Sequence, residues 1–167
     1  SMLPWRMPFI NMRDHKKILV VDGRTGFMGG LNIGEENIAA SHPRHPVSDT
    51  HFEIQGPVVH QLSEAFARDW AFTRGEELTA DIFFPSQVGN GSVLSRIVTA
   101  GPDLDMEKIE YTMLQAFTMA RHSIRIMTPY FLPDDRFLTE LALASLRGIE
   151  VDIVVPWHSN HTLLDWA

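Results

Sequence analysis

Cysteine is absent from this chain, lysine occurs only three times, and no run of about twenty apolar residues is present. The lack of cysteine excludes disulfides and thiol chemistry. The lack of a long apolar run excludes a membrane-spanning helix in this stretch of sequence. Basic residues are also few, since 14 Lys and Arg stand against 21 Asp and Glu for a net charge of −7. That balance disfavours binding to a nucleic-acid backbone, or to anionic lipid, through bulk charge.

The 167 residues are 44% hydrophobic, which is enough for a core, and their periodicity predicts the α/β class. The first predicted part, residues 1–101, has strands at 18–21, 27–33, 50–54 and 93–99, and a helix after Gly56-Pro57 with Val59, Leu62, Phe66 and Trp70 in the core. A seam at residues 100–103 precedes the second part, 102–167. That part is predicted to have a helix with Ile109, Met113, Phe117 and Ala120 on one face, then a β-α-β unit made of a strand at 124–127, a helix from Asp135 to Gly148 and a strand at 150–155.

The most informative segment has the spacing H-x-K-x4-D-x6-G-G-x-N, formed by His15, Lys17, Asp22, Gly29-Gly30 and Asn32. Because alternate side chains of a strand share a face, we expect His15 and Lys17 to project together. An imidazole, an ammonium and a carboxamide at one point suit phosphoryl chemistry. The histidine would act as nucleophile or general acid, and the other two groups would stabilise a non-bridging oxygen.

The register of this predicted hairpin depends on its turn, which Asp22-Gly23 marks. A two-residue loop of Gly23 and Arg24 would pair Asp22 with Thr25. Asn32 would then lie across from His15, and Gly30 across from Lys17. A longer loop would shift this register by a residue or two.

The stretch from Asn11 to Gly34 resembles the HKD signature of the phospholipase D superfamily, and its cardiolipin synthase branch in particular. Further stretches are similar to that branch in the same order, at 49–51, 56–59, 66–70, 128–134 and 147–151. The resemblance therefore runs over nearly the whole chain. It implies a phospholipase D-like mixed β-sheet flanked by helices, incomplete here because the chain straddles two halves.

The resemblance also implies an activity, that of a phosphatidyltransferase converting phosphatidylglycerol to cardiolipin through a phosphohistidine, without cofactor or metal. It makes His15, Lys17 and Asn32 catalytic, and it gives Asp49 the role of orienting the catalytic histidine. From the residues alone, Asp49 could equally be an Asx-turn residue. Asp22 completes the motif, but its strand parity is opposite to that of His15, which favours a structural role at the turn.

The partners implied by the resemblance are a phospholipid substrate and the bacterial inner membrane. Contact with the membrane is expected through regions outside this segment. The segment itself is expected to face the cytoplasm. No nucleic-acid partner is expected, and a homo-oligomer is left open.

Enzymes of this type carry two HKD motifs, whereas here only Lys17 stands two residues after a histidine. We therefore expect this chain to be a piece that is inactive in isolation. The alternative is a phosphodiesterase or endonuclease of the same superfamily, in which a symmetric dimer supplies both histidines. The acidic charge and the second-half segments disfavour that alternative.

The other histidines give weaker signals. His42, His45 and His51 could ligate a metal together with Asp49, but the Pro-rich loop around the first two disfavours a pre-organised site. His158 and His161 follow the last predicted strand, where a solvated turn is favoured over a ligand loop. Tyr130-Phe131 is either the lining of a lipid-facing cleft or ordinary packing.

The layout of the resembled enzymes predicts that a second H-x-K-x4-D motif lies beyond Ala167 in the natural reading frame. Sequencing the gene from which this chain is taken checks the expectation directly. A stop codon at position 168 would contradict the synthase interpretation and favour the dimeric alternative.

Overall fold

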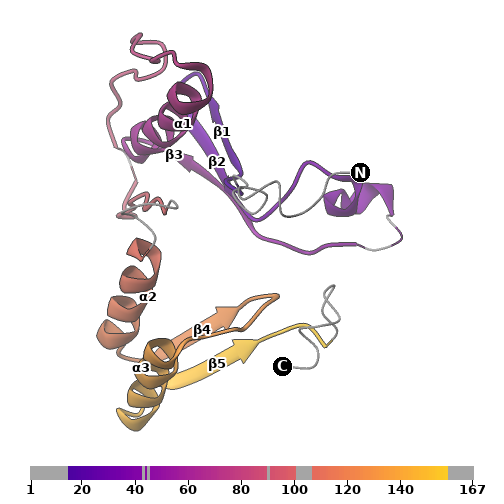
Figure 1. Ribbon diagram of the computed structural model, residues 1–167, viewed down its shortest axis with the longest axis vertical. Helices are drawn as coiled ribbons and strands as arrows, with labels where there is room; N and C mark the ends of the chain where they lie inside the picture. The colour runs from indigo at the N-terminus through magenta and orange to yellow at the C-terminus, as the bar shows by residue number, and fades with distance from the viewer. Residues whose placement is uncertain (1–14, 43, 45, 90, 101–106, 158–167) are drawn as a thin grey trace, which may run out of the picture. The chain divides into compact units, whose positions relative to one another are not determined.

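The fold is described by a computed structural model covering residues 15–42, 44, 46–89, 91–100 and 107–157 (Figure 1). The chain forms two compact units, residues 1–98 and 99–167. Each unit combines strands with helices, so the predicted α/β class is confirmed. The assignment of residues 1–101 and 102–167 to two phospholipase D-like halves stays a prediction. Asn11, Arg13, His45, the seam at 101–103, and the pair His158 and His161 lie outside the described residues.

The first unit is built on an antiparallel sheet in the order β1-β2-β3, with strands β1 (Ile18–Val21), β2 (Thr25–Gly29) and β3 (His51–Gln55). Asp22 and Gly23 have φ angles of 53° and 62°, and the N–H of Arg24 donates to the carbonyl of Val21 over 3.0 Å. This is the left-handed turn that an Asp-Gly pair favours in a hairpin.

The predicted register of the hairpin is wrong by one residue. Val21, not Asp22, pairs with Thr25, because Asp22 belongs to the loop together with Gly23 and Arg24 and makes it three residues long. The predicted pairing of Asn32 with His15 is therefore lost. The predicted pairing of Gly30 with Lys17 is lost for the same reason. The returning strand also ends at Gly29 and does not continue to residue 33.

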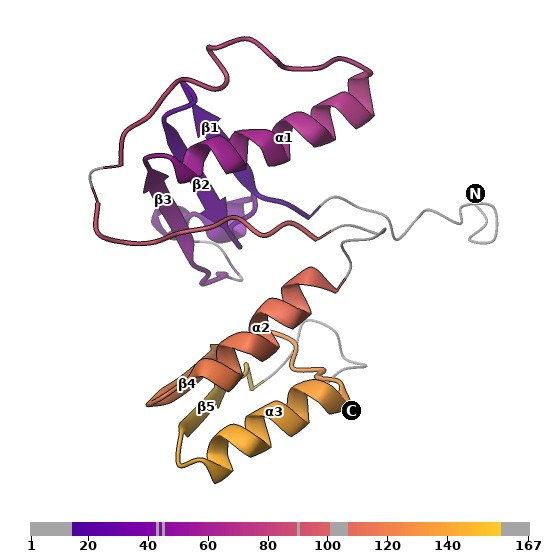
Figure 2. The ribbon, with the colours of Figure 1, turned by 90° about the vertical axis from the view of Figure 1, so that its left-hand side faces the viewer.

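Helix α1 (Val58–Arg74) covers one face of this sheet, as Figure 2 shows. Val59 and Leu62, on the side of α1 that faces the sheet, are completely buried. A Cβ on Gly26 of β2 would lie only 2.7 Å from the Leu62 side chain, so the helix rests directly on the strand backbone. The expectation that Phe66 is core is wrong, because it is 44% exposed and stacks on Trp70 at a ring distance of 6.1 Å.

Two short 3-10 helices, η2 (Glu35–Asn37) and η3 (Ala39–Ser41), occupy the connection from β2 to β3. The segment 93–99, predicted to be a strand, has no regular secondary structure. Its apolar residues resemble those of a strand, but Val93 and Leu94 are almost fully exposed and find no sheet to join among the described residues.

The second unit contains α2 (Lys108–Met119), β4 (Ser123–Met127), α3 (Asp135–Leu146) and β5 (Glu150–Val154). β4 and β5 pair in parallel, with Ser123 opposite Glu150, so the predicted β-α-β unit is confirmed. Its core consists of Phe117, Ile124, Leu141, Ala144 and Ile149.

Helix α3 begins at an N-cap supplied by Asp134, whose carboxylate accepts the N–H of Phe137 over 2.8 Å. This hydrogen bond, and after it the guanidinium of Arg136, lowers the pKa of Asp134 below its usual 3.8. A carboxyl whose pKa is lower in the folded state stabilises the fold above its unfolded pKa. That stabilisation is lost as the pH falls through the folded pKa.

The variant Asp134→Asn keeps an N-cap acceptor but cannot titrate. Between about pH 5 and about pH 2, we expect the free energy of unfolding to fall more steeply in the unmodified chain than in this variant. Urea unfolding followed by circular dichroism at a series of pH values measures the difference. Asp135→Asn changes the neighbouring carboxyl and is the matched control. Equal pH slopes for the unmodified chain and Asp134→Asn would contradict the assignment.

Candidate functional site

The sheet of the first unit has one covered face and one open face. Gly26 and Ile54 lie on the face covered by α1, since a Cβ at Gly26 would meet both Leu62 and Ile54. Leu19 and Val21 alternate with the covered residues of β1 and are 56% and 42% exposed. The side of the sheet away from α1 is called the open face below.

The two residues of the H-x-K pair immediately precede β1 and lie on the open face. Lys16 reaches the opposite side, where its Nζ is 2.7 Å from both carboxylate oxygens of Asp69 in α1. Lys17 and His15 alternate with Lys16 and therefore belong to the open face. The Nζ of Lys17 donates to the carbonyl of His15 over 2.8 Å, while the His15 side chain is exposed. The expectation that the two project together is consistent with this arrangement.

Gly30 provides room for Asp49 beside the end of β2. The N–H of Gly30 donates to the carbonyl of Thr50 over 3.0 Å, which draws the segment before β3 against this glycine. A Cβ placed on Gly30 would overlap the Asp49 carboxylate. Asp49 also accepts the N–H of Thr50 over 2.6 Å, so its side chain is held by the local backbone. The Asx-type role and a role at the site are therefore compatible.

His51 lies against the other glycine, Gly29, with which it pairs in the β2–β3 ladder. A Cβ on Gly29 would be 2.6 Å from the Cα of His51 and 2.8 Å from its Nδ1. That Nδ1 is buried and makes no hydrogen bond to any residue that the structure describes. The sequence suggested His51 only as a metal ligand. The D-x-H alternation at 49–51 is the sequence signal that would have placed His51 on the same side of the chain as Asp49.

The remaining predicted residues are Asp22 and Asn32. Asp22 is at the turn, at the opposite end of β1 from His15. Asn32 follows the end of β2 and has an exposed side chain. Its predicted place opposite His15 depended on the register that the hairpin does not have. In the described part of the chain, no three His, Asp or Glu side chains are grouped closely enough to hold a metal ion.

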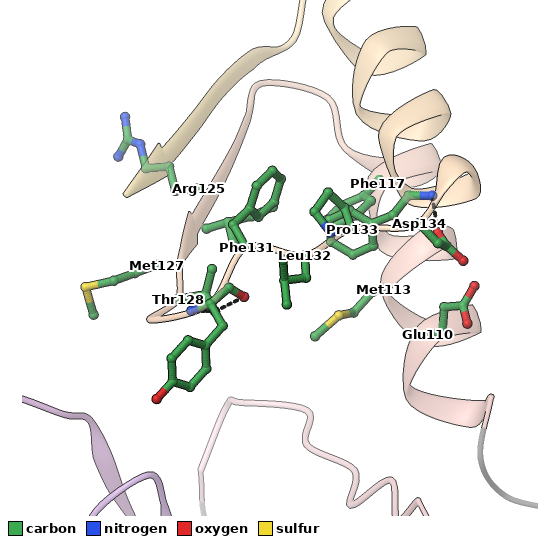
Figure 3. A pocket seen from close by; sticks show the side chains of 13 residues that line it. Glu110, Met113, Phe117, Arg125, Met127, Thr128, Phe131, Leu132, Pro133 and Asp134 are labelled. Atoms are coloured by element: carbon green, nitrogen blue, oxygen red, sulfur yellow. Dashed lines mark hydrogen bonds between the residues drawn. The ribbon is translucent and has the colours of Figure 1, made fainter. Parts of the chain in front are cut away.

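The second unit has an open depression between α2, β4 and the start of α3, shown in Figure 3. Its lining is largely apolar and includes Met113, Phe117, Phe131, Leu132 and Phe137. The centroid of the Phe137 ring lies 4.8 Å from that of Phe117 and 6.3 Å from that of Phe131. Phe131 therefore takes part in the packing of this aromatic cluster. Glu110 and Asp134 lie at the same end of the depression. The described lining contains no histidine or lysine.

Comparison with known proteins bears on the whole chain. Residues 113–167 match the family described as "Cardiolipin synthase, PLD-like domain". All of the chain matches 36% of cardiolipin synthase 2 of Staphylococcus epidermidis RP62A, at 38% identity. It likewise matches 35% of a cardiolipin synthase of Staphylococcus aureus Mu50, at 36% identity.

The chain is related to the cardiolipin synthases. The resemblance to this branch of the phospholipase D superfamily is thereby confirmed. The major cardiolipin synthase ClsA of Bacillus subtilis 168 is 36% identical over 95% of the chain. The chain spans about a third of the length of these cardiolipin synthases. No solved structure matches it. No helix in the described part is long and apolar enough to cross a membrane.

The contact between Gly30 and Asp49 can be tested by adding one methyl group. Gly30→Ala should lower the free energy of unfolding by about 1–3 kcal/mol, because the new Cβ displaces the carboxylate. Urea unfolding measures this loss. Most of it should disappear in the Asp49→Ala background, where nothing remains to be displaced.

The matched control is Gly91→Ala, since a Cβ at Gly91 meets open space. We expect it to change the free energy of unfolding by less than about 0.5 kcal/mol. A penalty for Gly30→Ala that is the same with and without Asp49 would show that the two residues are not in contact.

Proposed function

We propose that this chain is part of a cardiolipin synthase-like phosphatidyltransferase that uses phosphatidylglycerol as both donor and acceptor. The observation that carries the proposal is the H-x-K pair on the open face, with Gly29-Gly30 and Asp49 beside it. The 36–38% identity to cardiolipin synthases supports the same reaction. A phosphodiester needs a nucleophile, cations around its non-bridging oxygens and space beside them, and these residues supply all three.

In the first step, an imidazole nitrogen of His15 attacks the phosphorus of phosphatidylglycerol. The bond from phosphorus to the head-group glycerol oxygen breaks, and a second histidine donates the proton that this oxygen needs. Glycerol leaves, and the phosphatidyl group stays on His15 as a phosphohistidine. The second histidine belongs to the further HKD motif expected elsewhere in the natural protein, and the two histidines can exchange these roles.

In the second step, the now neutral second histidine takes the proton from a glycerol hydroxyl of another phosphatidylglycerol. The oxygen attacks the phosphorus, the bond from phosphorus to the imidazole breaks, and cardiolipin is released. Two phosphatidylglycerol molecules thus give one cardiolipin and one glycerol, and both histidines return to their starting protonation states.

The other residues of the proposed site stabilise charge and geometry. Lys17 and Asn32 would bind the non-bridging oxygens as negative charge develops in the transition state. Asp49 would accept the Nδ1–H of the catalytic histidine and thereby fix its orientation. Asp22 acts through the turn of the hairpin.

The setting of the reaction follows from its substrate. Because phosphatidylglycerol is a membrane lipid, we place the whole enzyme at the bacterial inner membrane with this segment on its cytoplasmic side. Regions outside this segment would hold it at the membrane. The chain alone carries one HKD motif and is proposed to be inactive.

The role of His15 is tested by expressing the full-length protein in cells that lack their own cardiolipin synthase. Lipids are then separated by thin-layer chromatography. The variant His15→Ala should lose at least about a thousandfold in cardiolipin formation from phosphatidylglycerol, because no phosphohistidine can form. His60→Ala, which changes an exposed histidine of α1, should keep full activity. Cardiolipin formation by the His15→Ala variant at the unmodified rate would refute the proposal.

A further inference from the structure

Three residues make a row across the open face: Lys17, which immediately precedes β1, Gly29 in β2 and His51 in β3. Gly29 in the central strand pairs with His51 in β3. On its other side, continuation of the β1–β2 ladder one step past the Ile18–Met28 pair puts Lys17 next to Gly29. The row is therefore Lys17, Gly29 and His51. Its middle residue, Gly29, has no side chain.

The spacing of this row suits a tetrahedral anion. Neighbouring strands lie about 4.8 Å apart, so the backbones of the outer two strands are separated by about 10 Å. An ammonium and an imidazole can lean in from the two sides over the bare Gly29 backbone. The gap between them is then of the size that a phosphate group with two hydrogen bonds fills.

The side chains leave donors available for such an anion. The Nζ of Lys17 uses one N–H on the His15 carbonyl and has three in total. The Nδ1 of His51 is buried without a partner among the described residues, while the side chain as a whole is half-buried. Nε2 is therefore the ring nitrogen that a ligand can reach.

We propose that His51 and Lys17 together bind the phosphodiester of the substrate, with His51 donating from Nε2 to a non-bridging oxygen above Gly29. This inference rests on the proposed function and adds a residue to its binding site. His51 neither attacks phosphorus nor transfers the proton of the leaving alcohol. Its contribution is to hold the phosphate beside His15, which lies two residues before Lys17 on the same face.

The inference can be tested by titrating inorganic phosphate into this chain at constant ionic strength and following the backbone amide signals of Gly29 and Gly30 by NMR. We expect saturable shifts at both glycines. In His51→Phe, which keeps a ring against Gly29 but has no nitrogen, the Kd for phosphate should rise about tenfold. In His51→Gln, whose amide can still donate, the rise should stay below about threefold.

The matched control is His60→Phe, the same substitution at an exposed histidine of α1, and it should leave the Kd unchanged. Dispersed amide spectra establish that each variant is folded, and His51→Leu, which also lacks a donor, replaces His51→Phe if that variant is not. Unchanged phosphate binding in a folded His51→Phe would overturn the inference. So would the absence of shifts at Gly29 and Gly30 in the unmodified chain, or equal weakening in His51→Gln and His51→Phe.

This outcome is independent of the test of the proposed function. If phosphate binding depends on His51 but cardiolipin formation survives His15→Ala, the phosphate site stands and the proposed reaction fails. If His15→Ala abolishes cardiolipin formation but His51→Phe binds phosphate normally, only the assignment of His51 fails.

Discussion

The close approach of the segment before β3 to two glycines determines the shape of the candidate site. A backbone hydrogen bond from Gly30 to Thr50 draws the two segments together, and the residues on either side of Thr50 then occupy the space above the glycines. A side chain at Gly29 or Gly30 would push them away. Polar groups from the two outer strands can therefore meet over the central one, which contributes only backbone.

Local signals were sufficient for most of the fold. The apolar run at 18–21, the Asp22-Gly23 turn and the periodic helix after Gly56-Pro57 all formed where the sequence indicated. The β-α-β unit is equally local, because its helix has an N-cap at Asp134 and ends before Gly148. Residues 93–99 have strand-like composition but no strand, because a strand needs a neighbour that composition cannot supply.

The candidate site was harder to predict than the fold, because its geometry depends on one residue of loop length. Whether Asp22 belonged to the strand or to the turn decided the register, and no short-range rule settles that choice. Asn32 was expected opposite His15 for this reason. The position of His51 against Gly29 could not be predicted for a different reason. It depends on the pairing of β2 with a strand more than twenty residues later in the chain.

The parallel sheet of the second unit has only two strands in the described part of the chain, so β4 and β5 each have an outer edge. Edges of this kind add strands from other molecules, and natural proteins often blunt them with lysine. Neither β4 nor β5 contains a lysine, while Met127 and Val154 at their ends are exposed. Open edges of this kind favour strand pairing between copies of the chain as the protein concentration rises, whereas the charges of Arg125, Glu150 and Asp152 oppose it.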